Sequence, residues 1–171
     1  SLEENEPALL QDTLIIVVVN HGEDADELFK NDNKKTLQFL STSTYSITLG
    51  VVDAATPGLE LPPRQAGVGM ARKIGMDLAL PYLTDKTSLL FSTDADTIVH
   101  HQYLEIVLDY FKQYNADAAV VGFSHSVPEN PDLEHKIKEY EEFLFITALK
   151  IKETGSPYGY VAMGSTMVCT V

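Results

Sequence analysis

Two aspartates two positions apart are the residues of this chain best suited to chemistry. Asp94 and Asp96 follow a short apolar segment in the string LLFSTDADTIV. Two carboxylates that face one small volume repel each other unless they share a cation, and such oxygen ligands suit Mg²⁺ or Mn²⁺. Aspartate is also a common capping residue, and Asp-x-Asp is a short string that arises often by chance. The pattern leaves open a divalent-metal site and a purely structural role.

Other polar residues follow apolar segments in the same way. Val19, Asn20 and His21 lie at the end of one such segment, Asp53 ends a second, and Ser124, His125 and Ser126 follow another. Ligands of open α/β sheets bind beyond the carboxyl ends of the strands, so we expect these residues to converge on one sheet edge. For Asp53, capping of a local turn is the competing interpretation.

Three further charged residues lie on expected helices. Arg72 falls in the early turns of a helix expected over 65–80, where its guanidinium can face a diphosphate or Asp94. A solvated surface role is the competing interpretation for Arg72. Glu141 and Glu142 lie on an amphipathic helical segment, and we expect them to form part of its solvated face.

Short apolar segments alternate with segments of helical period along the chain. Strands are expected over 14–20, 47–53, 88–93 and 117–123, with another over 167–171. Helices are expected over 24–40, with Asn31, Asp32 and Asn33 as a potential break, and over 65–80, 101–114 and 130–153. The Pro-rich stretch 54–64 is expected to be a loop. Repeated strand–helix units with nearly continuous apolar strands predict one α/β domain over 1–171 with a doubly wound, mostly parallel sheet.

The charge balance narrows the range of ligands. The 171 residues include 12 Lys and Arg against 25 Asp and Glu, for a net charge of −13. Such a field repels phosphate backbones and anionic lipids, which argues against nucleic-acid partners and against binding to a membrane surface. A phosphate ligand would need its charge neutralised by something other than a basic patch, and a divalent cation is the obvious candidate. The longest purely apolar run, 14–19, is too short to span a membrane, and the single Cys169 fits a reducing, cytoplasmic location.

Taken together, these motifs resemble those of glycosyltransferase family 2, which has the Rossmann-like GT-A fold of the nucleotide-diphospho-sugar transferases. LIIVVVNHGED resembles the opening strand and nucleotide-facing loop of the family, and GVVDAATPG resembles its second strand with the terminal aspartate. GVGMARKIGMDLAL resembles its Ala-Arg-Asn-x-Gly helix, and LLFSTDADTIV its Asp-x-Asp strand. MGSTMVCTV resembles the Gly-Ser segment on the acceptor side. Val17, Val19 and Lys73 depart from the usual residues of the family.

The resemblance implies roles for the matching residues. Asp53 would contact the nucleobase, Val19 and Asn20 would line the base pocket, and Arg72 would help to hold the nucleotide. Asp94 would contact the ribose or a metal-bound water, and Asp96 would coordinate the Mn²⁺ or Mg²⁺ that bridges the donor diphosphate. The implied reaction moves a sugar from a nucleotide-diphosphate donor to a hydroxyl of a glycan, lipid or protein acceptor. We expect this chain to be the donor-binding part of a longer protein, with the general base beyond Val171.

Two alternatives remain open at the level of sequence. In a haloacid-dehalogenase-like phosphatase that depends on Mg²⁺, Asp94 would be the nucleophile, Asp96 the general acid, and Ser124 part of a second motif. Against it, we find no later pair of adjacent aspartates, and the Asp94–Asp96 string falls after two earlier strand–helix units. The other alternative is a non-catalytic module that binds nucleotide sugars, which the departures at Val17, Val19 and Lys73 favour.

Overall fold

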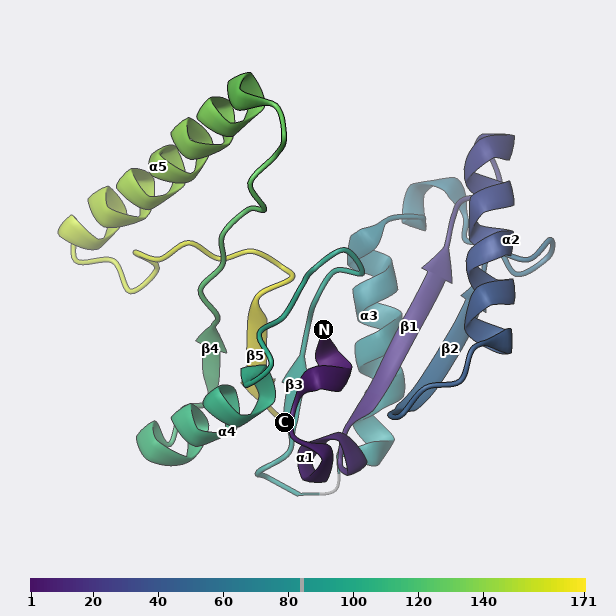
Figure 1. Cartoon of the computed structure of the whole chain (residues 1–171), viewed down its shortest axis with the longest axis horizontal. Coiled ribbons are helices and arrows are strands. Elements are labelled where there is room, and N and C mark those ends of the chain that lie inside the picture. Colours follow the sequence, from purple (N-terminus) through teal and green to yellow (C-terminus); the bar gives the residue numbers. More distant parts are fainter. Residues whose placement is uncertain (84) are drawn as a thin grey trace. The chain divides into compact units, whose positions relative to one another are not determined.

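The computed structural model describes residues 1–83 and 85–171, and the chain is a mixed α/β structure (Figure 1). Its α-helices are α1 (Pro7–Gln11), α2 (Glu27–Thr42), α3 (Val68–Ala79), α4 (Tyr103–Tyr114) and α5 (Pro131–Glu153). Its strands are β1 (Leu14–Asn20), β2 (Thr48–Ala54), β3 (Leu89–Phe91), β4 (Ala118–Val120) and β5 (Met167–Thr170). Short 3-10 turns occur at Leu2–Glu4, Pro63–Gln65 and Leu80–Tyr82. No described helix is both long and apolar enough to cross a membrane.

The first sheet is a parallel pair of strands with a helix on each face. β1 pairs with β2 so that Val19 lies opposite Asp53. α3 approaches the face of β1 that carries Ile16 and Val18, with Gly75 turned toward the strand; a Cβ there would lie 3.4 Å from Val18 Cγ2, in van der Waals contact. α2 lies over the other face and lines a groove there with residues of β2. Alternate residues of a strand point to opposite faces, so the two helices cover opposite sides of this sheet.

The second sheet has the strand order β3-β5-β4, with β5 antiparallel to β4. Beyond the strand ends, the backbone N–H of Ser92 donates to the Met167 carbonyl at 2.9 Å. The N–H of Val121 likewise donates to the Thr166 carbonyl at 2.8 Å. The carboxyl ends of β3 and β4 therefore flank the start of β5, and the chain leaves both strands from the same edge.

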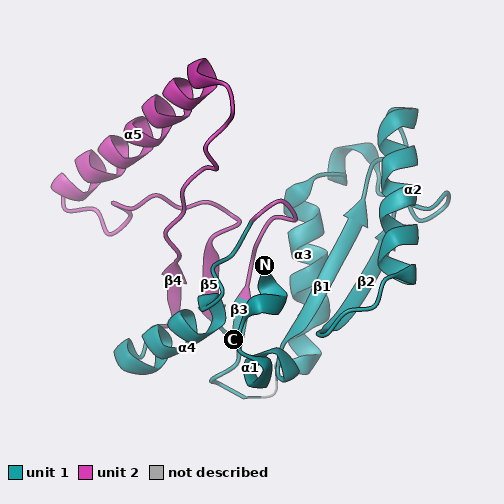
Figure 2. Ribbon diagram, in the orientation of Figure 1, with its two compact units in different colours: residues 1–90, 98–116, 170–171 teal, residues 91–97, 117–169 magenta. Residues whose placement is uncertain are grey.

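The chain divides into two compact units, coloured separately in Figure 2. The first comprises Ser1–Leu90, Ile98–Ala116 and Thr170–Val171, and the second comprises Phe91–Thr97 and Asp117–Cys169. Buried apolar residues of the first unit come from β1, the end of β2 and the inner face of α4, including Val19, Ala54 and Phe111. In the second unit Val168 of β5 is 1% exposed and forms the centre of the strands, whereas α5 is largely exposed.

The structure confirms each strand and long helix expected from the sequence, with ends shifted by a few residues. The strands expected over 88–93 and 117–123 are shorter, with three paired residues each, because their shared partner β5 has only four. α2 continues unbroken through Asn31, Asp32 and Asn33. The mixed α/β class is confirmed, and the strands hydrogen-bond as two separate sheets in the part of the chain that the structure describes.

Candidate functional site

The carboxyl ends of β1 and β2 bring together three residues expected at the nucleotide site. The strand register places Val19 beside Asp53 and Asn20 beside Ala54. Val19 is buried, and Asn20 and Asp53 are half-buried. Arg72, in the second turn of α3, is half-buried and belongs to the same compact unit. The first unit therefore holds the residues expected at a base pocket, Val19, Asn20 and Asp53, at the end of a parallel pair of strands, where α/β sheets bind ligands.

Hydrogen bonds from Asn33 fix the loop that follows β1. The Asn33 side-chain amide donates to the Asn20 carbonyl at 3.0 Å and contacts His21 Nδ1 at 2.9 Å. An amide nitrogen that donates to a carbonyl is a donor, so the Asn33 nitrogen donates to His21 Nδ1 as well. Nδ1 is therefore the acceptor, and a neutral His21 ring carries its proton on Nε2. His21 is 7% exposed, and Asn33 comes from the middle of α2. From the sequence, Asn33 was expected only as a potential helix break; the available signal was a polar residue on the half-buried side of α2, in line with Leu37.

Asp53 is held by the turn that follows β2. Its Oδ1 accepts the backbone N–H of Ala55 at 3.0 Å and of Thr56 at 2.8 Å. Partial burial raises the pKa of Asp53, but hydrogen bonds from the Thr56 side chain and from these backbone groups outweigh that effect and lower the pKa overall. The carboxylate therefore stays ionised at neutral pH and is a fixed hydrogen-bond acceptor.

A groove of about 580 Å³ runs between α2 and β2 beside Asp53. Apolar side chains of Leu37 and Val51 form part of its wall, and Lys34 adds a positive charge. Its remaining lining residues are polar: Gln38, Ser41, Asp53 and Thr56. A groove of this kind, with a few placed polar groups, is suited to a small planar or polar ligand.

Asp94 and Asp96 lie in one tight turn in the second compact unit. The backbone N–H of Thr97 donates to the Asp94 carbonyl at 3.1 Å, which closes a turn with Ala95 and Asp96 at its centre. Asp94 is half-buried and Asp96 is exposed. The turn comes two residues after Ser92, whose backbone N–H donates to the Met167 carbonyl at the start of β5. The turn therefore lies at the same edge of the sheet as Gly164 and Ser165, which lead into β5. Among the described residues, no three His, Cys, Asp or Glu side chains form a ready-made metal cluster.

The structure also reveals an imidazole–carboxylate pair in the second unit. Glu141 Oε1 accepts one hydrogen bond from the His125 ring at Nδ1, at 2.8 Å, and a second from the His125 backbone N–H, also at 2.8 Å. Glu141 was expected on a solvated face; instead its side chain is only 24% exposed, because the segment after β4 folds back along α5. The two residues are 16 positions apart, and no local pattern pairs them. The hydrogen bonds from the backbone N–H and then from the ring lower the pKa of Glu141.

Comparisons with protein-family models, with curated proteins and with solved structures found no match.

Proposed function

We propose that this chain binds a nucleotide-diphosphate sugar and forms the donor-binding part of a glycosyltransferase of family 2 with the GT-A fold. The observation that carries the proposal is the turn at Asp94 and Asp96. It places two aspartates just beyond the carboxyl end of β3, the kind of position at which α/β sheets bind ligands. The Gly164-Ser165 loop leaves the same edge, in keeping with the acceptor-side role that the resemblance implies.

The donor set at this turn fits Mg²⁺ or Mn²⁺ bound together with a diphosphate. Mg²⁺ usually takes one or two protein carboxylates, several waters and substrate phosphates, so it needs no cage of three or more protein ligands. Asp96 is exposed and can reach such an ion, and Asp94, two residues before it, is half-buried. The ion would supply positive charge that offsets the charge of the diphosphate as it leaves. On a chain of net charge −13, that offset is essential for binding an anionic donor.

The first unit carries the residues that we propose contact the nucleoside. Asp53 is an ionised acceptor at the end of β2, suited to an N–H group of a nucleobase. Val19 and Asn20 lie next to it in register, and Arg72 is proposed to contact the phosphates. Helices on both faces of β1–β2 support a doubly wound, mostly parallel sheet as the architecture of the domain. We propose a cytoplasmic location, which the single Cys169 fits.

In the proposed reaction, the acceptor hydroxyl oxygen attacks the anomeric carbon of the donor sugar. The new C–O bond forms as the bond from that carbon to the diphosphate oxygen breaks, and the diphosphate leaves with the electron pair. The hydroxyl proton passes to a general base, for which no residue of this chain is assigned. Arg72 stabilises the charge that develops on the leaving diphosphate. Asp53, Val19 and Asn20 hold the nucleoside so that the anomeric carbon is presented to the acceptor.

A thermal-shift screen of the full chain tests this proposal. UDP, GDP, dTDP, CDP and ADP are each added with and without Mn²⁺ to wild type, Asp96→Asn and the exposed control Asp109→Asn. We expect one nucleotide to raise the Tm by about 5 °C or more at a hundredfold excess over Kd, only with Mn²⁺. The shift should be lost in Asp96→Asn and kept in Asp109→Asn.

Other outcomes of the screen contradict the proposal in distinct ways. Stabilisation by Mg²⁺ with a phosphate analogue such as beryllium fluoride, but by no nucleotide, would favour the phosphatase alternative. Nucleotide binding that is unaffected by Asp96→Asn would remove the metal role from this turn. Binding as proposed, with no sugar release or transfer by a longer protein that contains this chain, would favour the non-catalytic module.

A further inference from the structure

The pair of His125 and Glu141 has the geometry of an oriented hydrogen-bonding group. A carboxylate only accepts hydrogen bonds, so the His125 ring carries a proton on Nδ1, and the neutral ring leaves the Nε2 lone pair available. Among the described residues, no hydrogen bond to Nε2 is found. The second bond, from the His125 backbone N–H to the same carboxylate oxygen, fixes the position of the ring as well as its proton. The His125 side chain is 34% exposed, so a ligand can reach it.

Aromatic rings hold the imidazole from two sides. Phe123 and Tyr140 meet it edge-on, with ring centroids 5.8 Å and 5.9 Å away and interplanar angles of 81° and 68°. These T-shaped contacts restrict rotation of the ring about its bonds. The result is a rigid acceptor beside aromatic surface.

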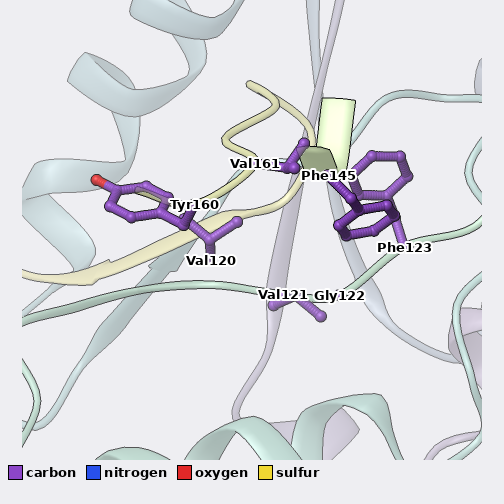
Figure 3. Close-up of a pocket in the computed structure, with 7 residues that line it drawn as sticks. All are labelled: Val120, Val121, Gly122, Phe123, Phe145, Tyr160 and Val161. Carbon is purple, nitrogen blue, oxygen red and sulfur yellow. The ribbon is translucent and has the colours of Figure 1, made fainter. Parts of the chain in front are cut away.

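Phe123 also lines an apolar cavity of about 170 Å³, shown in Figure 3. Phe145 of α5, Tyr160 and Val161 come from later segments, and the remaining lining is the chain from β4 onward: Val120, Val121, Gly122 and Phe123. The volume corresponds to roughly six waters at ~30 Å³ each, enough for one small ring. Since Phe123 contacts both the cavity and His125, the apolar surface and the polar acceptor adjoin.

An apolar cavity next to a fixed hydrogen-bond acceptor suits a sugar ring, which has apolar C–H faces and a rim of hydroxyl groups. We propose that His125, positioned by Glu141, accepts a hydrogen bond from a sugar hydroxyl while the sugar ring packs against Phe123. The assignment rests on the proposed function, because it gives the sugar of that reaction a place on this chain.

The position in the second sheet agrees with this assignment. β4 leads to His125 and β3 leads to Asp94 and Asp96, and both strands end at the start of β5. One strand separates them, so the strand ends lie about two strand spacings, or ~10 Å, apart. The segments that carry the Asp94–Asp96 turn and His125 therefore leave the same edge of the second sheet.

The test uses two variants that separate folding from ligand contact. His125→Asn keeps an N–H near the Nδ1 position for Glu141 but has no atom at Nε2, and His125→Phe keeps the ring contacts but loses both nitrogens. His135→Asn is the matched control, because His135 is an exposed histidine on α5 paired with Glu139 at 3.4 Å. Circular dichroism and Tm verify that each variant is folded.

Calorimetry compares UDP with UDP-glucose and UDP-N-acetylglucosamine, and GDP with GDP-mannose, all with Mn²⁺. If the sugar is that of the donor, the affinity gained from the sugar should fall about fivefold to tenfold in both His125 variants, with the affinity for UDP or GDP unchanged. If the sugar is that of the acceptor, this gain is unaffected. Saturation-transfer NMR with phenyl β-glucoside, β-galactoside and α-mannoside should then lose its signal in the His125 variants only.

The outcomes separate this inference from the proposed function. If wild type binds nucleotides, but binds nucleotide sugars no more tightly than the nucleotides alone and does not bind the glycosides, the sugar site is overturned and the donor proposal stands. Glycoside binding that depends on His125, without any nucleotide binding, would support the sugar site and overturn the proposed function. Equal behaviour of His125→Asn and His135→Asn in both assays would overturn the role of His125.

Discussion

At the level of single residues, Asp53 serves the turn after β2 as well as the proposed nucleotide. Its Oδ1 accepts two backbone N–H groups, and asparagine keeps a carbonyl oxygen at that place whereas alanine does not. We expect Asp53→Ala to lower the free energy of unfolding by about 1 kcal/mol and Asp53→Asn to lower it by clearly less. Urea unfolding measures both changes.

Nucleotide binding separates the two roles of Asp53. We expect Asp53→Asn to weaken binding of the nucleotide found in the screen by about tenfold, because an amide is a poorer acceptor than a carboxylate. A wild-type Kd for the asparagine variant would mean that Asp53 only caps its turn.

Glu141 gives the stability of the second unit a dependence on pH. Hydrogen bonds from the backbone N–H and ring of His125 lower the pKa of Glu141 in the folded state. The unfolded state therefore binds more protons than the folded state in the acid range. This contribution to stability is complete above the ordinary glutamate pKa of about 4.3 and is lost as the pH falls through the lower pKa of the folded state.

We expect Glu141→Gln to lower the Tm relative to wild type at about pH 5, and the gap to shrink toward about pH 3 as the wild-type carboxylate becomes protonated. Glu142→Gln, at the exposed neighbouring position, is the control and should show a small gap that changes little. Thermal unfolding at several pH values provides the measurement. A gap for Glu141→Gln that stays constant over this range would contradict the assigned pair.

At the level of elements, the approach of α3 to β1 depends on the small side of the helix at Gly75. A Cβ at Gly75 would lie 3.4 Å from Val18, whereas one at Gly69 of the same helix would meet no atom within 4 Å. We expect Gly75→Leu to lower the free energy of unfolding by about 1–3 kcal/mol through overpacking, and Gly69→Leu to lower it little or not at all. Chemical denaturation compares the two. Equal destabilisation would show that helix propensity, and not the contact with β1, decides the effect.

The same elements indicate what sequence reasoning can and cannot supply. β1, α3 and α5 were predicted because apolar spacing and the capping pair Asn130-Pro131 are local signals. The insertion of β5 between β3 and β4 was not predicted, because strand order depends on pairing between segments more than 40 residues apart. α1 was missed because five residues are too few to show a helical period.

The candidate site divides in the same way. Asp53, Asp94 and Asp96 could be selected from sequence because each follows an apolar strand, and the structure places each of them after a strand or at its end. The partners of His21 and His125 could not be selected, since Asn33 approaches His21 only when α2 lies over the strands, and Glu141 approaches His125 only when the segment after β4 lies along α5. Side-chain pairs across elements are settled by tertiary packing, which leaves no period in the sequence.

At the level of the whole molecule, the excess of negative charge makes the proposed function depend on a cation. A net charge of −13 disfavours every anionic ligand, so a nucleoside diphosphate should bind well only when a divalent ion offsets its charge. If that ion is held by Asp96, the effects of the ion and of this side chain on affinity are coupled. The coupling is measurable without knowledge of the acceptor.

The most direct measurement is therefore calorimetric titration of the full chain with the nucleotide found in the screen. Wild type and Asp96→Asn are each titrated with Mn²⁺ present and with Mn²⁺ removed by EDTA. We expect Mn²⁺ to tighten binding at least about tenfold in wild type and hardly at all in Asp96→Asn. The same enhancement by Mn²⁺ in both proteins, or no binding by wild type under either condition, would contradict donor binding through the Asp94–Asp96 turn.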